Sequence, residues 1–105
     1  MKTSKILRAA RAKIEAPERW IKGDSARNAE GCYVVSWSPF AVCWCGSGAN
    51  HAVLGLAGDW SAADEALETA VGGDFPDWQD APERTHPEVL AAFDKAIAER
   101  EAVGD

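Results

Sequence analysis

The sequence lacks the features that mark several large classes of protein. Its longest apolar stretch, residues 38–58, is interrupted by glycine, serine, asparagine and histidine, so we do not expect a membrane span. The first thirteen residues carry basic side chains throughout and no continuous apolar core, unlike a secretory signal or a transit peptide. The chain has no internal repeat and no low-complexity segment. These absences favour a cytoplasmic protein that does not enter the membrane.

Cysteine is also scarce. The chain has three cysteines, and two of them, Cys43 and Cys45, are separated by a single residue. An odd number at this spacing argues against a disulfide framework and for a reducing compartment. There is no C-x-x-C pair, and the glycines at positions 46 and 48 are not followed by the lysine of a phosphate-binding loop. We therefore expect neither a metal site nor a cofactor.

The composition is that of one small globular domain. The chain has 105 residues, of which 47% are hydrophobic and 27% charged, which is too apolar for intrinsic disorder. Its five tryptophans compensate for the small core that a chain of this size can build. We expect one domain over residues 1–105, mainly α (α+β), with about four helices around a buried central helix and a short β-hairpin near residues 25–36.

Two elements are predicted in the first third of the chain. Thr3 and Ser4 are N-cap candidates for a helix over residues 5–16, in which apolar side chains fall on one face. The sequence Asn-Ala-Glu-Gly at 28–31 is typical of a type I turn that ends in a left-handed glycine, and β-forming residues follow at 32–36. These signals predict the hairpin.

The central helix is predicted over residues 38–57. Ser38 followed by Pro39 is a strong start signal, and Gly58 is a typical residue beyond a helix end. The glycines at 46 and 48, with small residues further on, form a side without bulky side chains, which predicts that another element approaches closely. A break at residues 46–48 is the alternative.

Two further helices are predicted in the second half. An alanine-rich helix is expected over residues 63–71, and a capping box with Thr85 and Glu88 begins a last helix over residues 86–101. Between them, residues 74–84 contain two prolines, and we expect an ordered loop held by Phe75 and Trp78.

The residues that could carry chemistry are two cysteines and two histidines. A thiol-dependent hydrolase or transferase would use Cys45 or Cys43 with His86 or His51, oriented by Asp77 or Asp80. Inside the predicted helix, both cysteines lie a turn or more from its start, beyond most of the dipole's influence. Positions i and i+2 of a helix also point apart, so the two thiols cannot share a metal ion. We expect core cysteines and keep the thiol enzyme as the alternative.

The loop at 74–84 is the predicted binding surface, through Asp77, Trp78, Asp80 and Arg84. Asp80 and Arg84 stand on either side of a proline turn just before a helix. A structural interpretation has Asp80 bonded to backbone amides or to Arg84, so that the loop is held against the last helix. Contact with a ligand is the alternative.

The net charge of −6 is unevenly distributed. Residues 1–27 hold eight basic against three acidic residues, a net +5, and residues 28–105 hold three against fourteen, a net −11. The two parts could attract each other, the basic helix could contact an acidic partner or nucleic acid, or the acidic surface could imitate nucleic acid. The acidic balance argues against direct nucleic acid binding and for a protein partner.

Two blocks resemble the signature of a family of small bacterial and phage proteins of unknown function. They are W-C-x-x-G-A at residues 44–49 and W-x-D-x-P-x-R-T at residues 78–85, and the turn at residues 26–31 is similar to one in the family. The chain departs from the pattern at Gln79, where asparagine is usual, and at Gly46–Ser47, where larger apolar residues are usual. The resemblance implies no activity, but it implies a phage or mobile-element setting. We therefore expect a non-enzymatic binding or regulatory protein, for example an inhibitor of a nucleic-acid-binding host protein, with its oligomeric state undetermined.

Overall fold

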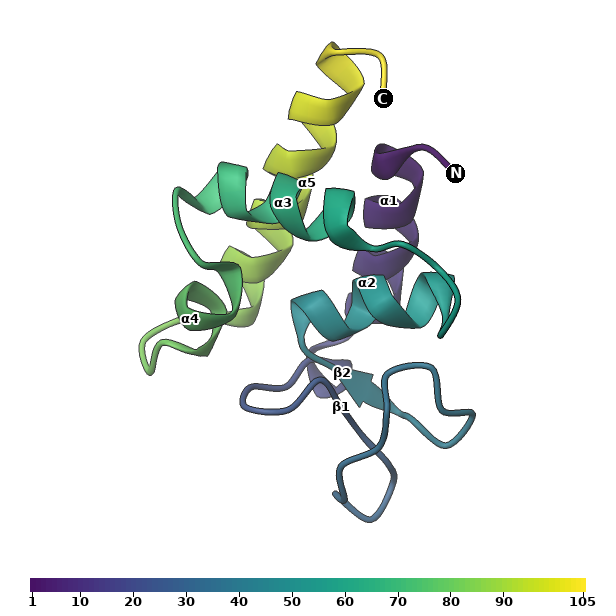
Figure 1. Cartoon of the computed structure of the whole chain (residues 1–105). Coiled ribbons are helices and arrows are strands. Elements are labelled where there is room, and N and C mark those ends of the chain that lie inside the picture. The colour runs from purple at the N-terminus through teal and green to yellow at the C-terminus, as the bar shows by residue number, and fades with distance from the viewer.

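Helices dominate the computed structural model, which describes residues 1–105 (Figure 1). The elements in chain order are α1 (Thr3–Lys13), a 3-10 turn η1 (Pro17–Arg19), β1 (Ala26–Arg27), β2 (Cys43–Trp44), α2 (Gly46–Leu54), α3 (Ser61–Val71), α4 (Phe75–Asp80) and α5 (His86–Ala102). The mainly helical architecture with a small two-stranded antiparallel sheet agrees with the predicted fold class. None of the helices is both long and apolar enough to cross a bilayer.

The core lies between α1, α2, α3 and α5. Helix α1 packs against α2 and α5, and α3 packs against α5 (Figure 1). The largest fully buried apolar side chains come from α1 and its C-cap, α3, α4 and α5: Leu7, Ile14, Leu67, Phe75, Val89 and Phe93. Each such side chain stabilises the fold by about 1.5–3 kcal/mol relative to exposure. Burial of the apolar faces, rather than helix propensity, therefore holds these helices together.

The start of α1 differs from the prediction. Thr3 and Ser4 are not caps but buried residues of the first helical turn, and the N-cap, Lys2, makes no side-chain hydrogen bond. The free N–H groups bond instead to Asp105. Thr3 N donates to the Asp105 carboxylate at 3.0 Å, and Ser4 N donates to the Asp105 main-chain carbonyl at 3.0 Å. A residue from the far end of the sequence thus provides the cap that local sequence was expected to supply.

The central helix is shorter than predicted and begins at Gly46, not at Ser38. The Ser38–Pro39 signal forms a tight turn in which Ser38 Oγ accepts from Phe40 N at 3.1 Å. The chain then becomes extended at Cys43–Trp44, because this segment pairs with β1. Gly46–Gly48 is therefore the beginning of α2 rather than a break within a longer helix.

The strand pairing also differs from the predicted hairpin. The turn at residues 28–31 forms, with Gly31 at φ +81° and Gly31 N donating to Asn28 O at 3.0 Å. However, β1 pairs antiparallel with β2, and Tyr33 contributes only a single bridge to Arg27. Pairing with β2 buries Ala26 and Trp44 in the core, which pairing with residues 33–36 alone would not do.

The predicted loop at 74–84 contains the short helix α4. Asp74 caps it, with its carboxylate accepting from Asp77 N at 2.9 Å, and Pro76 lies in its first turn. Asp-Phe-Pro is a start signal that could have been recognised in the sequence. The capping box of Thr85 and Glu88 at the start of α5 is present as predicted.

The predicted close approach at the glycines is confirmed. A Cβ added to Gly48 would lie 2.0 Å from the main-chain oxygen of Ser25. A Cβ added to Gly46 would lie 2.6 Å from the ring of Phe75. The start of α2 thus packs closely against the segment before β1 and against α4.

Candidate functional site

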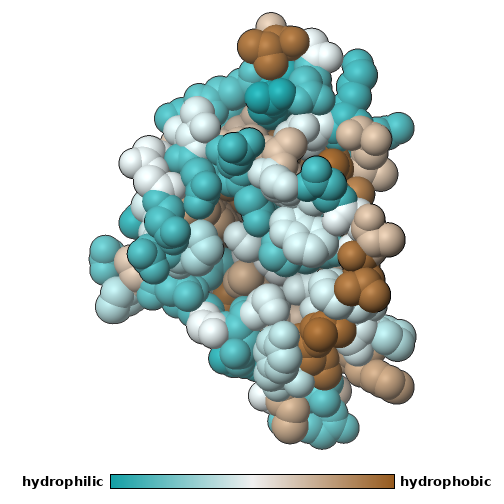
Figure 2. Space-filling view, in the orientation of Figure 1, coloured by the Kyte–Doolittle hydropathy of each residue, from teal (hydrophilic) through white to brown (hydrophobic).

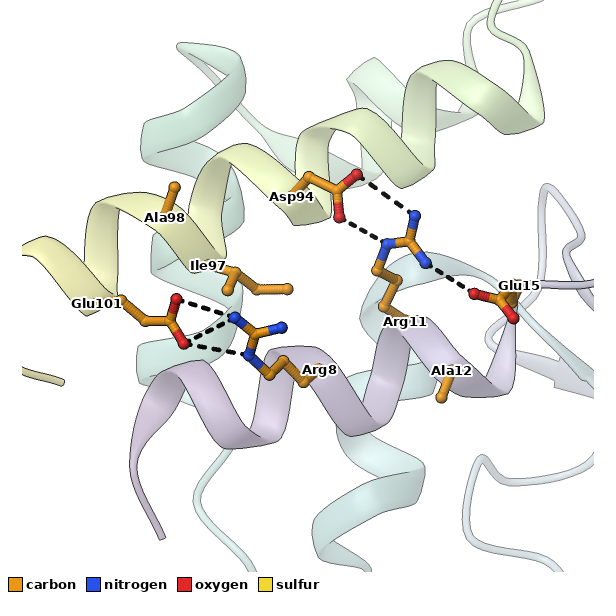
Figure 3. A pocket seen from close by; sticks show the side chains of 8 residues that line it. All are labelled: Arg8, Arg11, Ala12, Glu15, Asp94, Ile97, Ala98 and Glu101. Atoms are coloured by element: carbon orange, nitrogen blue, oxygen red, sulfur yellow. Dashed lines mark hydrogen bonds and ion pairs between the residues drawn. The ribbon is translucent and has the colours of Figure 1, made fainter.

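Ion pairs between α1 and α5 neutralise Arg8 and Arg11, two of the eight basic residues in the N-terminal region (Figure 3). Arg8 bonds to Glu101 at 2.9 Å, and Arg11 bonds to Asp94 at 2.7 Å and to Glu15 at 3.0 Å. The hydrogen bond to Asp94 raises the pKa of Arg11, although partial burial opposes this effect. The two oppositely charged parts of the chain therefore meet in a groove between α1 and α5, and the charged side chains that line this groove are all paired with one another.

The groove between α3 and α5 is different, because its carboxylates have no cationic partner. It has a volume of about 710 Å³ and is lined by Glu65, Glu68 and Glu99 together with small side chains. Its one cation, Arg100, bonds to the carboxylate of Asp105. The groove therefore offers negative charge that the chain itself does not compensate.

The acidic character continues from α3 through α4. Residues 28–83 contain no lysine or arginine. Asp77 and Glu83 are exposed and have no hydrogen bond to their carboxylates, and Asp74 bonds only to a backbone N–H. Figure 2 shows a largely hydrophilic surface on the left, where Figure 1 places the end of α3 and α4. We refer to the α3–α5 groove and the α4 segment together as the acidic surface.

The four predicted binding residues divide into two groups. Asp80 accepts from Gly23 N at 3.2 Å and does not bond to Arg84. Arg84 donates to Trp78 O at 2.9 Å, stacks on the Trp78 ring at 3.9 Å and bonds to Glu88 at 3.3 Å. Asp80, Arg84 and Trp78 thus hold α4 in place, and Asp77 alone projects freely from the acidic surface.

Gln79 is a structural residue that the sequence analysis did not identify as such. Its side chain is 1% exposed, and its Oε1 accepts from Gly46 N at 2.7 Å and from Trp20 Nε1 at 2.9 Å. It therefore ties α4 to the first turn of α2 and to the segment after η1. The only sign of this role in the sequence was that glutamine stands here where asparagine is usual in the family.

The cysteines do not lie inside a helix. Cys43 is buried in β2, and Cys45 is the N-cap of α2, where its sulfur accepts from Gly48 N at 3.2 Å. Burial raises the pKa of the Cys45 thiol, and the hydrogen bond from Gly48 only partly opposes this effect. The helix start would favour a thiolate, but loss of solvation has the larger influence.

Neither histidine bonds to a cysteine. His51 Nε2 lies 3.0 Å from the Asp64 carboxylate, and its ring packs 4.3 Å from that of Trp60. His86 Nε2 lies 2.6 Å from the main-chain oxygen of Ile14. None of the expected thiol–histidine pairs is therefore joined by a hydrogen bond. No group of three or more His, Cys, Asp or Glu side chains is placed to hold a metal ion.

The structure reveals a second surface, which is formed by residues 33–42. We call these residues the apolar segment. Five of its large side chains are exposed, with Tyr33 at 61% and Phe40 at 73% the most accessible. Figure 2 shows brown and tan side chains at the lower right, where the segment lies in Figure 1. The sequence predicted that these residues belong to a hairpin and to a buried helix, so this surface was not expected.

The comparison with protein families assigns the chain to a family. A family of unknown function, DUF6197, matches residues 1–99. The chain belongs to DUF6197. No curated protein and no solved structure matches the chain. The expected resemblance to a family of unknown function is thus confirmed, and for this DUF6197 member the two surfaces described above are the features from which a function can be argued.

Proposed function

We propose that this DUF6197 member is a non-enzymatic, cytoplasmic binding protein whose acidic surface contacts a basic protein partner. The observation that carries the proposal is the α3–α5 groove, whose three glutamates have no cationic partner within the chain. Lysine and arginine side chains of a partner would supply the missing positive charge. Two small residues that line the groove, Ala62 and Ala66, leave room for such side chains.

The charge arrangement also suggests the class of partner. A basic surface that normally contacts phosphate groups would recognise a row of carboxylates by the same electrostatic attraction. An inhibitor of a nucleic-acid-binding host protein fits this chemistry. A phage or mobile-element setting, which the family resemblance implies, is a natural context for such an inhibitor. The three free cysteines are in keeping with the reducing cytoplasm.

The test compares three double variants that each remove two negative charges. Glu65→Gln/Glu99→Gln alters the groove, and Asp77→Asn/Glu83→Gln alters the α4 segment. Glu18→Gln/Glu30→Gln is the matched control, because both residues are exposed, form no ion pair and lie outside the acidic surface. A host protein captured by the unaltered chain is purified, and its affinity for each variant is measured.

We expect the groove variant to weaken binding about three- to tenfold, as loss of two charge contacts predicts, and the control to change it little. Binding should also fall as salt rises from about 50 mM to about 500 mM, because screening shortens the reach of the charges. The captured protein should lose its nucleic acid when it binds. Equal weakening by all three variants, or capture that salt does not affect, would overturn the proposal.

A further inference from the structure

The apolar segment, residues 33–42, exposes five large apolar side chains close together in the sequence. Tyr33, Trp37 and Phe40 are 61%, 37% and 73% exposed, and Val35 and Val42 are exposed beside them. No charged residue occurs between Gly31 and Gly58. Exposed apolar patches without charge mark interaction sites in soluble proteins.

The backbone of the segment is held in place by hydrogen bonds. Ser38 N donates to Val35 O at 2.9 Å, and Ala41 N donates to Ser38 O at 3.2 Å, so that two turns follow each other. Trp44 Nε1 donates to the main-chain oxygen of the buried Ser36 at 2.9 Å. The exposed side chains therefore stand on an ordered support, which reduces the entropy lost on association.

The segment also contains an unpaired strand edge at Tyr33. The bridge between Tyr33 and Arg27 is made by Asn28 N to Cys32 O at 2.9 Å and by Val34 N to Ala26 O at 3.2 Å. In this antiparallel pattern the N–H and carbonyl of Tyr33 point away from β1, and neither has a partner. Proteins usually protect such edges with charged side chains, and none follows Tyr33 here.

We propose that the apolar segment is the interface of a homodimer, in which the Tyr33 edges of two copies pair antiparallel about a two-fold axis. Pairing of this kind is self-complementary, since each copy offers the same N–H and carbonyl to the other. Two molecules of net charge −6 repel each other, and residues 31–58 form the longest stretch without charge through which they can meet. The proposal is independent of the acidic surface, which lies on α3, α4 and α5.

The available area suits a weak dimer. An aromatic side chain offers about 150–250 Å², so the five partly exposed side chains offer on the order of 500 Å² per copy, or about 1,000 Å² per dimer. This is near the lower limit for a specific interface. We therefore expect a dissociation constant of about 10–100 μM.

The experiment is sedimentation velocity of the full chain from about 1 μM to about 500 μM, a range that brackets the expected constant. The unaltered chain should convert from monomer to dimer over this range. Phe40→Ser and Tyr33→Lys should each weaken the dimer at least about tenfold, because they alter the centre of the interface. Val103→Ser is the matched control, because Val103 is 70% exposed and follows α5, whose C-terminal end lies at the opposite end of the molecule from β1 and β2 (Figure 1).

Two further readouts distinguish this interface from other contacts. The dimer should tighten as salt rises, because screening reduces the repulsion between two acidic molecules, whereas binding of a basic partner weakens. Hydrogen exchange at the Tyr33 amide should slow as concentration rises. A chain that stays monomeric up to the highest concentration overturns the proposal, as does a dimer that persists in both variants. A dimer without protection of Tyr33 overturns the strand pairing.

Discussion

The carboxylate of Asp105 accepts a hydrogen bond from the backbone N–H of Thr3 at 3.0 Å, although 102 positions separate the two residues. Arg100 Nε holds the same carboxylate at 3.1 Å. Asp105 thus satisfies a free N–H at the start of α1 and places negative charge there, where the nearby lysines are unfavourable. This contact joins the start of α1 to the residues that follow α5.

Asp105 should make stability depend on pH in the acid range. The hydrogen bond from Thr3, and then the contacts with Arg100, lower the pKa of Asp105 to about 2. Because the folded-state pKa lies below the unfolded value of about 3.9, the stabilisation is complete above about pH 5 and disappears as pH falls towards 2. Asp105→Asn should therefore lower the melting temperature by a few degrees at pH 6, and the difference should vanish near pH 2.

Thermal unfolding of both proteins from pH 2 to pH 7 checks this prediction. Glu83→Gln is the control, since Glu83 is exposed and its carboxylate forms no hydrogen bond or ion pair. If the melting temperatures of Asp105→Asn and the unaltered chain differ by the same amount at every pH in this range, the Asp105 carboxylate does not act through its charge.

Gln79 should be a strong determinant of stability. Gln79→Met keeps a side chain of similar length but leaves the N–H groups of Gly46 and Trp20 without an acceptor. Each unsatisfied buried group costs about 1–3 kcal/mol. We therefore expect the free energy of unfolding, measured in urea, to fall by about 1–3 kcal/mol or more. Gln79→Asn keeps the amide on a shorter side chain and should lose less. A Gln79→Met variant as stable as the unaltered chain would contradict this role.

Gly48 should not tolerate a methyl group. Gly48→Ala places a Cβ 2.0 Å from the carbonyl oxygen of Ser25, and a main-chain atom cannot rotate away as a side chain can. We expect a destabilisation of about 1–3 kcal/mol or more. Gly73→Ala is the matched control, because nothing lies within 4 Å of its added Cβ, and it should change stability by less than about 0.5 kcal/mol. Equal effects at the two positions in urea unfolding would refute the close approach.

The cysteines should differ in reactivity towards an alkylating reagent at neutral pH. Cys32 is exposed and should react first. Cys43 is buried, and the pKa of Cys45 is raised by burial, so both should react at least about tenfold more slowly than Cys32 until the protein is unfolded. Mass spectrometry of partly alkylated protein gives the order. Fast and selective modification of Cys45 would instead favour the alternative of a thiol-dependent enzyme.

Much of the fold follows from local signals. The capping box of Thr85 and Glu88, the alanine-rich run of α3 and the turn that ends at Gly31 all act over a few positions, so the sequence reports them directly. The small residues on one side of the central helix also predicted that another segment approaches closely, and the main chain at Ser25 is that neighbour. The candidate site was harder to predict, because the roles of Asp80 and Arg84 depend on which backbone atoms lie beside them.

By itself, the sequence determined a mainly helical chain, the approximate position of its long helices, the excess of acidic residues and the family of unknown function. Tertiary structure decided where α2 begins, because β1 draws residues 43–44 into a strand and the side chain of Gln79, 33 positions away, accepts a hydrogen bond from Gly46 N in the first turn of the helix. It also decided which charges remain free, since Arg8 and Arg11 find their partners on α5 and leave the glutamates of the α3–α5 groove uncompensated. In each case the deciding contact joins residues far apart in the chain, and only the packing of the helices brings them together.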